Sequence, residues 1–287
     1  MSNKEFTSVC KQRKIAFIGA GNMASAIING WLDSGTVSSE DIIVFDVDKS
    51  KYDNFRKKGV NIADGVGDAV EFAEYVFLAL KPAFIKTALE NIMQVTDSFK
   101  SKVFISIAAA VPTTFICHVL AYQVPVIRVM PNTPMLIGHG AVAICKNSFV
   151  GKKQFEFICR ILSNLSTLQV IEESEMNAII SVNGSSPAYV YLFVKSMLDS
   201  AVSQGISADV ALPLILQSVV GSVEMIKQTG KSPDELIRMV ATPAGTTLAA
   251  LNVFESSGFE RIVSDAMQAC TARADEIQDE IVSTYKA

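Results

Sequence analysis

The chain alternates short apolar runs with amphipathic stretches, and this alternation constrains its fold more than any other feature. From Lys14 to about Ile171 the apolar runs read KIAFI, DIIVF, YVFLAL, KVFISIA and VPVIRVM. Helical patterns separate them, over residues 22–34, 49–58, 84–95 and 113–120. Short strands that alternate with helices predict a parallel sheet wrapped by helices. Two further strand candidates, at 140–145 and 167–171, flank a helix at 152–165.

The pattern changes after Glu175, because helical periods continue from there and no strand candidate remains. The expected helices cover residues 183–204, 207–229, 232–240 and about 260–285. Ser232 opens the third of them with a capping box. The segment AYVYLFV is apolar nearly all round, which indicates burial on more than one side. We therefore expect an α/β domain over residues 1–174 and an all-α domain over 175–287 that dimerises.

The composition favours a small-molecule partner. Charged residues make up 19% and apolar residues 49% of the 287 residues, and this apolar surplus predicts a subunit interface as well as cores. The net charge of −4 argues against nucleic acid or an anionic membrane as the main partner.

The five cysteines, at positions 10, 117, 145, 159 and 270, contain no CxxC pair. They therefore predict neither a disulfide framework nor a metal site, and free thiols fit a reducing compartment. No segment near the N-terminus is long and apolar enough for a signal or membrane segment. We expect a soluble, cytoplasmic protein.

The segment IAFIGAGNMASAI places Gly19, Gly21 and Ala24 as GxGxxA between a strand and a helix. In a dinucleotide site the first glycine makes the tight turn and the second lets the backbone approach the pyrophosphate. The third position allows close helix packing, and the phosphates lie on the helix N-terminus. The alternative interpretation is a tight turn without a ligand.

Asp46 ends the second strand, where a carboxylate would bind the ribose hydroxyls of NAD and repel a 2′-phosphate. Lys49 and Lys51 are close enough in sequence to soften that repulsion. This pattern favours NADH slightly and leaves NADPH open.

No residue set typical of acid–base or nucleophilic catalysis is present. His118 and His139 lack a neighbouring partner motif, and no Ser-His-acid set, GxSxG or HExxH pattern occurs. Three neutral motifs remain, at 78–82 (LALKP), 129–134 (VMPNTP) and 241–251 (ATPAGTTLAAL). Each could be only a turn. The first two, however, follow strands on the side of the sheet where ligands bind in doubly wound folds.

Together these motifs resemble the pyrroline-5-carboxylate reductase family. The resemblance covers Ile15 to Ile277 and includes IGAGNMA, ALKP, SIAAAVP, RVMPNTP, NGSSPAYVY and ATPAGTTLAAL in the family's order. It implies an N-terminal Rossmann-type doubly wound domain, a helical C-terminal domain that forms a homodimer, and often a ring of dimers. It also implies reduction of 1-pyrroline-5-carboxylate to L-proline with NAD(P)H, the last step of proline biosynthesis.

The resemblance also assigns residues. The cofactor-binding residues it implies are Gly19, Ala20, Gly21, Asn22, Met23, Ala24, Asp46, Ala79, Leu80, Lys81, Pro82, Ala108, Ala109 and Asn132, with Asn132 near the nicotinamide. The substrate-binding residues it implies are Thr242, Ala244, Gly245, Thr246 and Thr247.

The neutral loop suits an imine substrate. An imine nitrogen can arrive protonated, so catalysis needs orientation, a hydrogen-bonding partner at nitrogen and an anchor for the carboxylate rather than a strong acid. A turn over 243–246 would open a helix at about Thr247, whose free N–H groups suit a carboxylate. Thr247 is the candidate catalytic hydroxyl and Thr242 a second carboxylate contact. The alternative is that Thr242 and Thr246 only cap the helix.

The chain departs from the family pattern at several positions. Ala110 and Ala244 replace usual glycines, Asn183 replaces a serine, and Ser186 replaces another glycine. These departures keep a catalytically weakened nucleotide-binding paralogue open. A reductase of another cyclic imine or of a β-hydroxyacid is also open, with Lys195 as the candidate lysine of the latter.

Overall fold

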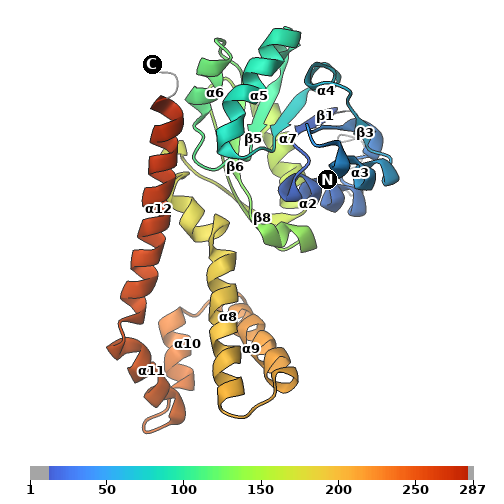
Figure 1. Cartoon of the computed structure of the whole chain (residues 1–287). Coiled ribbons are helices and arrows are strands. Elements are labelled where there is room, and N and C mark those ends of the chain that lie inside the picture. The colour runs from blue at the N-terminus through green and yellow to red at the C-terminus, as the bar shows by residue number, and fades with distance from the viewer. Residues whose placement is uncertain (1–12, 284–287) are drawn as a thin grey trace. The chain divides into compact units, whose positions relative to one another are not determined.

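The computed structural model describes residues 13–283 (Figure 1). Its contacts divide the chain into two compact units. Among the described residues, the first unit comprises 13–185 together with 269–283, and the second comprises 186–268. The expected boundary lay after residue 174. In the structure the first unit extends to Ser185 and also includes the end of the last helix.

The elements follow the expected alternation of strands and helices. The strands are β1 (Ile15–Ile18), β2 (Ile42–Phe45), β3 (Asn61–Ile62), β4 (Tyr75–Leu78), β5 (Val103–Ser106), β6 (Val126–Met130), β7 (Gly140–Lys146) and β8 (Ser166–Val170). The helices of the first unit are α2 (Asn22–Asp33), α3 (Asp53–Lys57), α4 (Val66–Phe72), α5 (Pro82–Val95), α6 (Thr113–Val119) and α7 (Lys152–Ser163). The later helices are α8 (Ser186–Ser203), α9 (Ala208–Thr229), α10 (Pro233–Val240), α11 (Thr246–Ser256) and α12 (Phe259–Ser283).

The eight strands form one sheet in the order β3-β2-β1-β4-β5-β6-β7-β8. Ile15 of β1 lies opposite Ile42 of β2 on one side and Tyr75 of β4 on the other, all parallel. The chain therefore starts in the middle of the sheet and winds outward in both directions, as predicted for a doubly wound fold.

Alternate residues of each strand point to opposite faces of the sheet, and each face has its own core. Ile15 and Phe17 of β1 pack on the side of α2, α3 and α7. Ala16 and Ile18 pack on the side of α4, α5 and α6. Burial on both faces explains why the strands are continuously apolar rather than alternating.

The direction of β7 was predicted wrongly. The expected sheet was parallel, but β7 runs antiparallel to β6, with Met130 opposite Ala143. Residues 131–139 form the whole connection between the two strands. A parallel crossover needs about a dozen residues or more, so this connection returns the chain in the opposite direction.

The first C-terminal helix also begins later than predicted. A π-helical turn, Ile180–Gly184, precedes α8, which starts at Ser186 instead of Asn183. The Asn183 side chain donates hydrogen bonds to the backbone oxygens of Met130, at 2.8 Å, and Ala141, at 3.0 Å. These bonds hold the turn against the ends of β6 and β7, so the regular helix begins after it.

The end of α12 is attached to the first unit through Asn177. The Asn177 amide nitrogen donates to Asp275 Oδ1 (2.8 Å) and Gln278 Oε1 (3.1 Å) on α12. Its amide oxygen accepts from Nη2 of Arg128 on β6 at 2.8 Å, and Arg128 is buried. One side chain therefore connects a strand of the sheet to the last helix.

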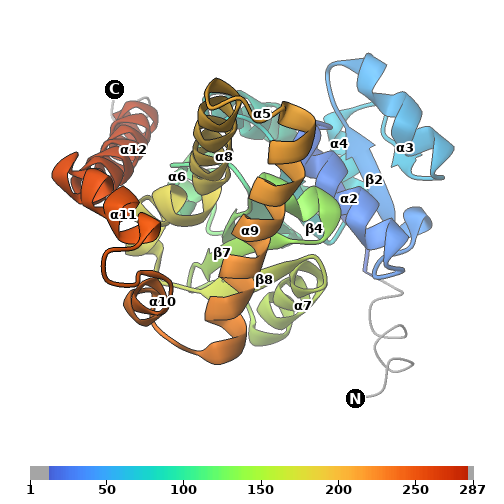
Figure 2. The same ribbon diagram turned by 90° about the horizontal axis from the view of Figure 1, so that it is seen from below.

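The second unit has almost no core of its own. Its helices α8 and α9 pack against each other (Figure 2). Among residues 186–268, all of which the structure describes, only Ala211 and Ile215 are buried.

The helix α9 is long and apolar enough to cross a membrane by length and composition, although it contains Pro213. The predicted capping box of Ser232 opens α10, and Gly230, with a left-handed backbone, ends α9.

Candidate active site

The glycine loop after β1 requires glycine at position 19, because of its backbone conformation and its close neighbour. This residue has φ +106°, and a Cβ there would collide with the carbonyl oxygen of Ala79. Gly21 caps α2 without a side-chain hydrogen bond, and a Cβ built on it would meet no atom within 4 Å. The loop thus leaves open space at the positive end of a helix, which is the arrangement that accepts a phosphate.

A cavity of about 520 Å³ adjoins this loop. Six of the predicted cofactor residues line it, namely Gly19, Gly21, Asp46, Ala79, Leu80 and Lys81. Phe84, Thr87, Ala88 and Asn91 of α5 also line it, as do Val47, Lys51 and Val66. Sequence analysis missed the four α5 residues, although their spacing of three, four and seven places them on one face of an amphipathic helix.

The remaining predicted cofactor residues of the loop and of α5 do not line this cavity. Ala24 is buried and packs α2 against the sheet, the role expected for the third position of the motif. Ala20 is buried, Met23 and Pro82 are half-buried, and Asn22 is exposed. Pro82 is the first residue of α5, where its missing N–H costs nothing.

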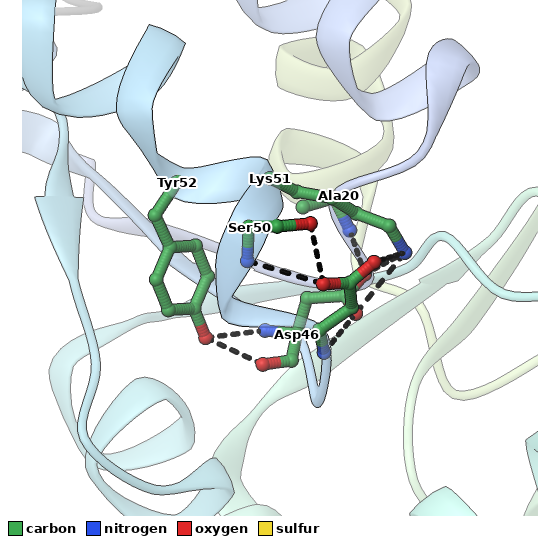
Figure 3. Close-up of polar contacts among 6 residues, drawn as sticks. Ala20, Asp46, Ser50, Lys51 and Tyr52 are labelled. Carbon is green, nitrogen blue, oxygen red and sulfur yellow. Dashed lines mark hydrogen bonds and ion pairs between the residues drawn. The ribbon is translucent and has the colours of Figure 1, made fainter.

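Asp46 is buried and hydrogen-bonded on both carboxylate oxygens (Figure 3). Oδ2 accepts the Ala20 N–H at 2.7 Å, and Oδ1 accepts the Asp48 N–H at 2.8 Å. The Lys51 ammonium donates to both oxygens, at 3.2 Å and 3.0 Å. Burial alone would raise the pKa of Asp46, but these hydrogen bonds and the lysine charge outweigh it and hold the pKa below its ordinary value.

Asn132 stands at the same edge of the sheet, after β6. Its Oδ1 accepts the Ala141 N–H at 2.8 Å, and its Nδ2 donates to the Asn183 backbone oxygen at 3.1 Å. Both ends of the amide are therefore engaged by the protein itself. Ala108 and Ala109 follow β5 at this edge, with Ala108 buried and Ala109 half-buried.

The predicted substrate residues lie in the second unit, around the start of α11. Gly245 N–H donates to the Thr242 backbone oxygen at 3.0 Å, which closes a turn over 242–245. A Cβ on Gly245 would lie 2.6 Å from Thr242 Oγ1, so a larger residue here would displace the Thr242 side chain. Ala244 has φ +61°, the left-handed region that glycine normally occupies. With Pro243 before it, the turn has the pattern of type II.

The helix start differs by one residue from the prediction. Gly245 is the N-cap and α11 begins at Thr246, so the interpretation of Thr242 and Thr246 as N-caps is wrong. The N-cap residue Gly245 has no side chain with which to cap the helix. The first N–H groups of α11, which have no acceptor within the helix, are therefore free to donate hydrogen bonds to an anion. Thr247, half-buried, is the second helical residue.

Comparisons with known proteins match both parts of the chain. A model described as pyrroline-5-carboxylate reductase dimerisation matches residues 173–277, and one described as NADP oxidoreductase, coenzyme F420-dependent, matches residues 14–110. The pyrroline-5-carboxylate reductase of Escherichia coli (strain K12) is 33% identical over 271 residues, covering 93% of this chain and 98% of the relative. The chain belongs to the pyrroline-5-carboxylate reductase family.

Solved structures of this family have the same fold. The Plasmodium falciparum pyrroline carboxylate reductase with NADP bound has a TM-score of 0.86 at 26% identity, covering 93% of this chain and 99% of that one. The Coxiella burnetii pyrroline-5-carboxylate reductase has a TM-score of 0.83 at 30% identity with the same coverage. The family resemblance and the fold class predicted from the motifs are both confirmed.

Proposed function

We propose that this chain reduces 1-pyrroline-5-carboxylate to L-proline with NAD(P)H, the last step of proline biosynthesis. Two features found together in one chain of this family support the proposal. One is the glycine loop beside its cavity, and the other is the N-terminus of α11, which has free N–H groups and a threonine in its first turn. Nothing in this pair of sites requires an acid or a base, which suits a substrate whose C=N bond is already reactive.

The residues of the cavity fit the reductant. The open space at Gly21 and the N-terminus of α2 suit the pyrophosphate, and the apolar side chains of Val47, Val66 and Phe84 suit an adenine ring. When bound, the nicotinamide supplies the hydride that saturates the imine carbon. Both ends of the Asn132 amide are already hydrogen-bonded within the protein, so this side chain is not free to bind the cofactor. We therefore assign it the role of fixing the loop after β6 beside the nicotinamide.

The start of α11 would hold the substrate. Its unpaired N–H groups and the Thr242 hydroxyl would bind the ring carboxylate, and Gly245 and Ala244 would set the loop that presents them. The Thr247 hydroxyl would hydrogen-bond the imine nitrogen and stabilise the change in charge there during reduction. An imine that binds in its protonated form already carries the proton that the product nitrogen requires, so hydride addition to its carbon needs no proton donor from the chain.

The same account includes a homodimer. The second unit exposes large apolar side chains on α8 and α9, and the dimerisation model of the family covers this region. Within the unit, a groove of about 930 Å³ between α8, α9, α11 and α12 is lined mostly by apolar side chains. We propose that a second copy covers these faces; a ring of such dimers would be a further step of assembly.

We place the enzyme in the cytoplasm. The four described cysteines are free, and burial raises the pKa of three of them, Cys117, Cys145 and Cys159, which keeps those thiols protonated. Free thiols suit a reducing compartment.

We further propose that NADH is slightly preferred over NADPH, because a carboxylate ends β2 where a 2′-phosphate would lie.

An absorbance assay with 1-pyrroline-5-carboxylate tests the reaction. The purified protein is expected to oxidise either cofactor only when the imine is present, and a six-membered cyclic imine added as competitor reports on ring size. Cofactor binding without turnover would favour a nucleotide-binding paralogue. Turnover of a β-hydroxyacid instead would favour that reductase class, although its candidate Lys195 is ion-paired with Asp199 (2.6 Å) on an exposed helix face.

A further inference from the structure

The carboxylate of Asp46 has no acceptor capacity left for a ribose hydroxyl. Two oxygens offer about four lone-pair positions. The N–H groups of Ala20 and Asp48 occupy one on each oxygen, and the Lys51 ammonium donates to both. A hydroxyl that approaches from the cavity can therefore bind Asp46 only after Lys51 has moved away.

The backbone that carries Lys51 is held by several hydrogen bonds, whereas its side chain is anchored only through its ammonium group. The turn Lys49–Tyr52 is capped by Asp48, which accepts the Ser50 N–H at 3.1 Å. The Tyr52 hydroxyl donates to the Asp46 backbone oxygen at 2.6 Å. The Lys51 side chain, in contrast, is 40% exposed and lines the cofactor cavity beside Gly19 and Gly21.

The charges around this point nearly balance. Asp46 and Asp48 face Lys51, with Asp48 Oδ2 at 4.0 Å, while Lys81 lines the same cavity from the turn before α5. A 2′-phosphate entering here would meet an ionised carboxylate whose charge is partly offset by two backbone N–H groups, and a lysine that can turn toward the phosphate. A ribose diol would instead displace the lysine from Asp46.

We propose that Lys51 is the residue that determines cofactor specificity, as a movable counterion that pairs with Asp46 or binds a 2′-phosphate. This inference rests on the proposed function of the cavity. It explains how a chain with an aspartate at the end of β2 uses NADPH as well as NADH. Lys51 sets the affinity for the phosphate, and Asp46 sets the affinity for the diol once Lys51 has swung aside.

Binding of two nucleotide fragments tests the role of Lys51 without any turnover. Adenosine 2′,5′-bisphosphate and 5′-AMP are titrated into the full-length protein by calorimetry. Lys51→Met is expected to weaken the bisphosphate by about tenfold or more, the worth of one charge-assisted hydrogen bond, and not to weaken 5′-AMP. Lys51→Arg keeps the charge and is expected to retain most of the bisphosphate affinity.

Lys49→Met is the matched control, because Lys49 lies on the same turn and is exposed. It is expected to change neither affinity by more than about twofold, since exposed charges interact weakly. Equal weakening of both fragments by Lys51→Met would overturn the proposal, as would equal effects of Lys49→Met and Lys51→Met on the bisphosphate. Normal fragment selectivity in a protein that does not reduce the imine would contradict the proposed reaction alone.

Discussion

Three alanines of the described residues, Ala110, Ala121 and Ala244, have the left-handed backbone that glycine normally adopts, and two of them are departures from the family pattern. Ala110 has φ +60° and Ala244 has φ +61°, and both stand where the family pattern usually has glycine. The sequence identified them as departures, but it could not reveal the left-handed backbone that makes each departure costly. For an L-residue this conformation costs about 1–2 kcal/mol. The two sites differ in surroundings, since Ala244 is exposed and Ala110 is fully buried.

Replacing each alanine with glycine separates strain from packing. Ala244→Gly relieves the strain and loses no buried contact, so we expect the free energy of unfolding to rise by up to about 1 kcal/mol. Ala110→Gly also removes a methyl group packed against Ile180 and Ala274, worth about 0.8 kcal/mol, so its net change should be near zero. Urea denaturation measures both. A loss of stability in Ala244→Gly would contradict the assignment of strain.

Thr247 carries the one side-chain contribution to chemistry that the proposed mechanism requires. Thr247→Ala is expected to lower turnover by roughly tenfold to a hundredfold, the effect of losing one transition-state hydrogen bond of about 1.4 to 2.7 kcal/mol. Thr247→Ser retains the hydroxyl and should stay close to the parent rate. Steady-state kinetics at saturating imine makes the comparison, and parent turnover in Thr247→Ala would exclude this residue.

Among the helices and strands, the spacing of apolar residues predicted the long helices and the buried strands. It did not predict the short elements or the direction of β7. β3 covers only Asn61–Ile62 and α4 only Val66–Phe72, too short for a clear period. The antiparallel β7 depends on the length of a connection, and the late start of α8 depends on long-range hydrogen bonds of Asn183. The glycine loop was predictable because the positions that need a small residue for the turn and for close packing carry glycine or alanine in the sequence. The α5 side of the cavity was not, because it depends on tertiary packing.

Asn177 joins α12 to the sheet through hydrogen bonds to both. Asn177→Leu keeps the branched shape of the side chain but leaves the buried Arg128 without its 2.8 Å partner and frees Asp275. We expect the free energy of unfolding to fall by about 2–4 kcal/mol. Gln278→Leu removes only the outer hydrogen bond and should cost about 1 kcal/mol or less. Chemical denaturation compares the two, and equal losses would show that the Asn177 junction has no special role.

For the whole molecule, the excess of apolar residues in the sequence finds its explanation in the second unit. Residues 186–268 bury only two side chains, so this unit cannot be stable through its own core. Sequence composition predicted an interface, and the family model for dimerisation agrees with it. The sequence could not say which faces meet, because α8 and α9 are apolar on several sides.

A charged residue in the apolar stripe of α9 tests the dimer. Leu212, Leu216, Val220 and Val223 recur at helical spacing and are exposed. Val220→Asp should shift the protein from dimer to monomer in sedimentation equilibrium and lower its melting temperature, because a carboxylate would be buried. Ser222→Asp, two positions along and on the opposite side of the helix, is the control and should remain dimeric. A fully dimeric Val220→Asp protein would place the interface elsewhere.

The reaction proposed for this protein transfers a hydride from the nicotinamide to the imine carbon of 1-pyrroline-5-carboxylate. The most direct measurement supplies NADPH, or NADH, deuterated at the transferable C4 position and analyses the product by mass spectrometry. We expect L-proline that carries one deuterium on the carbon of the former C=N bond, formed in equal amount to the cofactor oxidised. Cofactor oxidation without labelled proline, or no turnover by a protein that binds both nucleotide fragments, would contradict it.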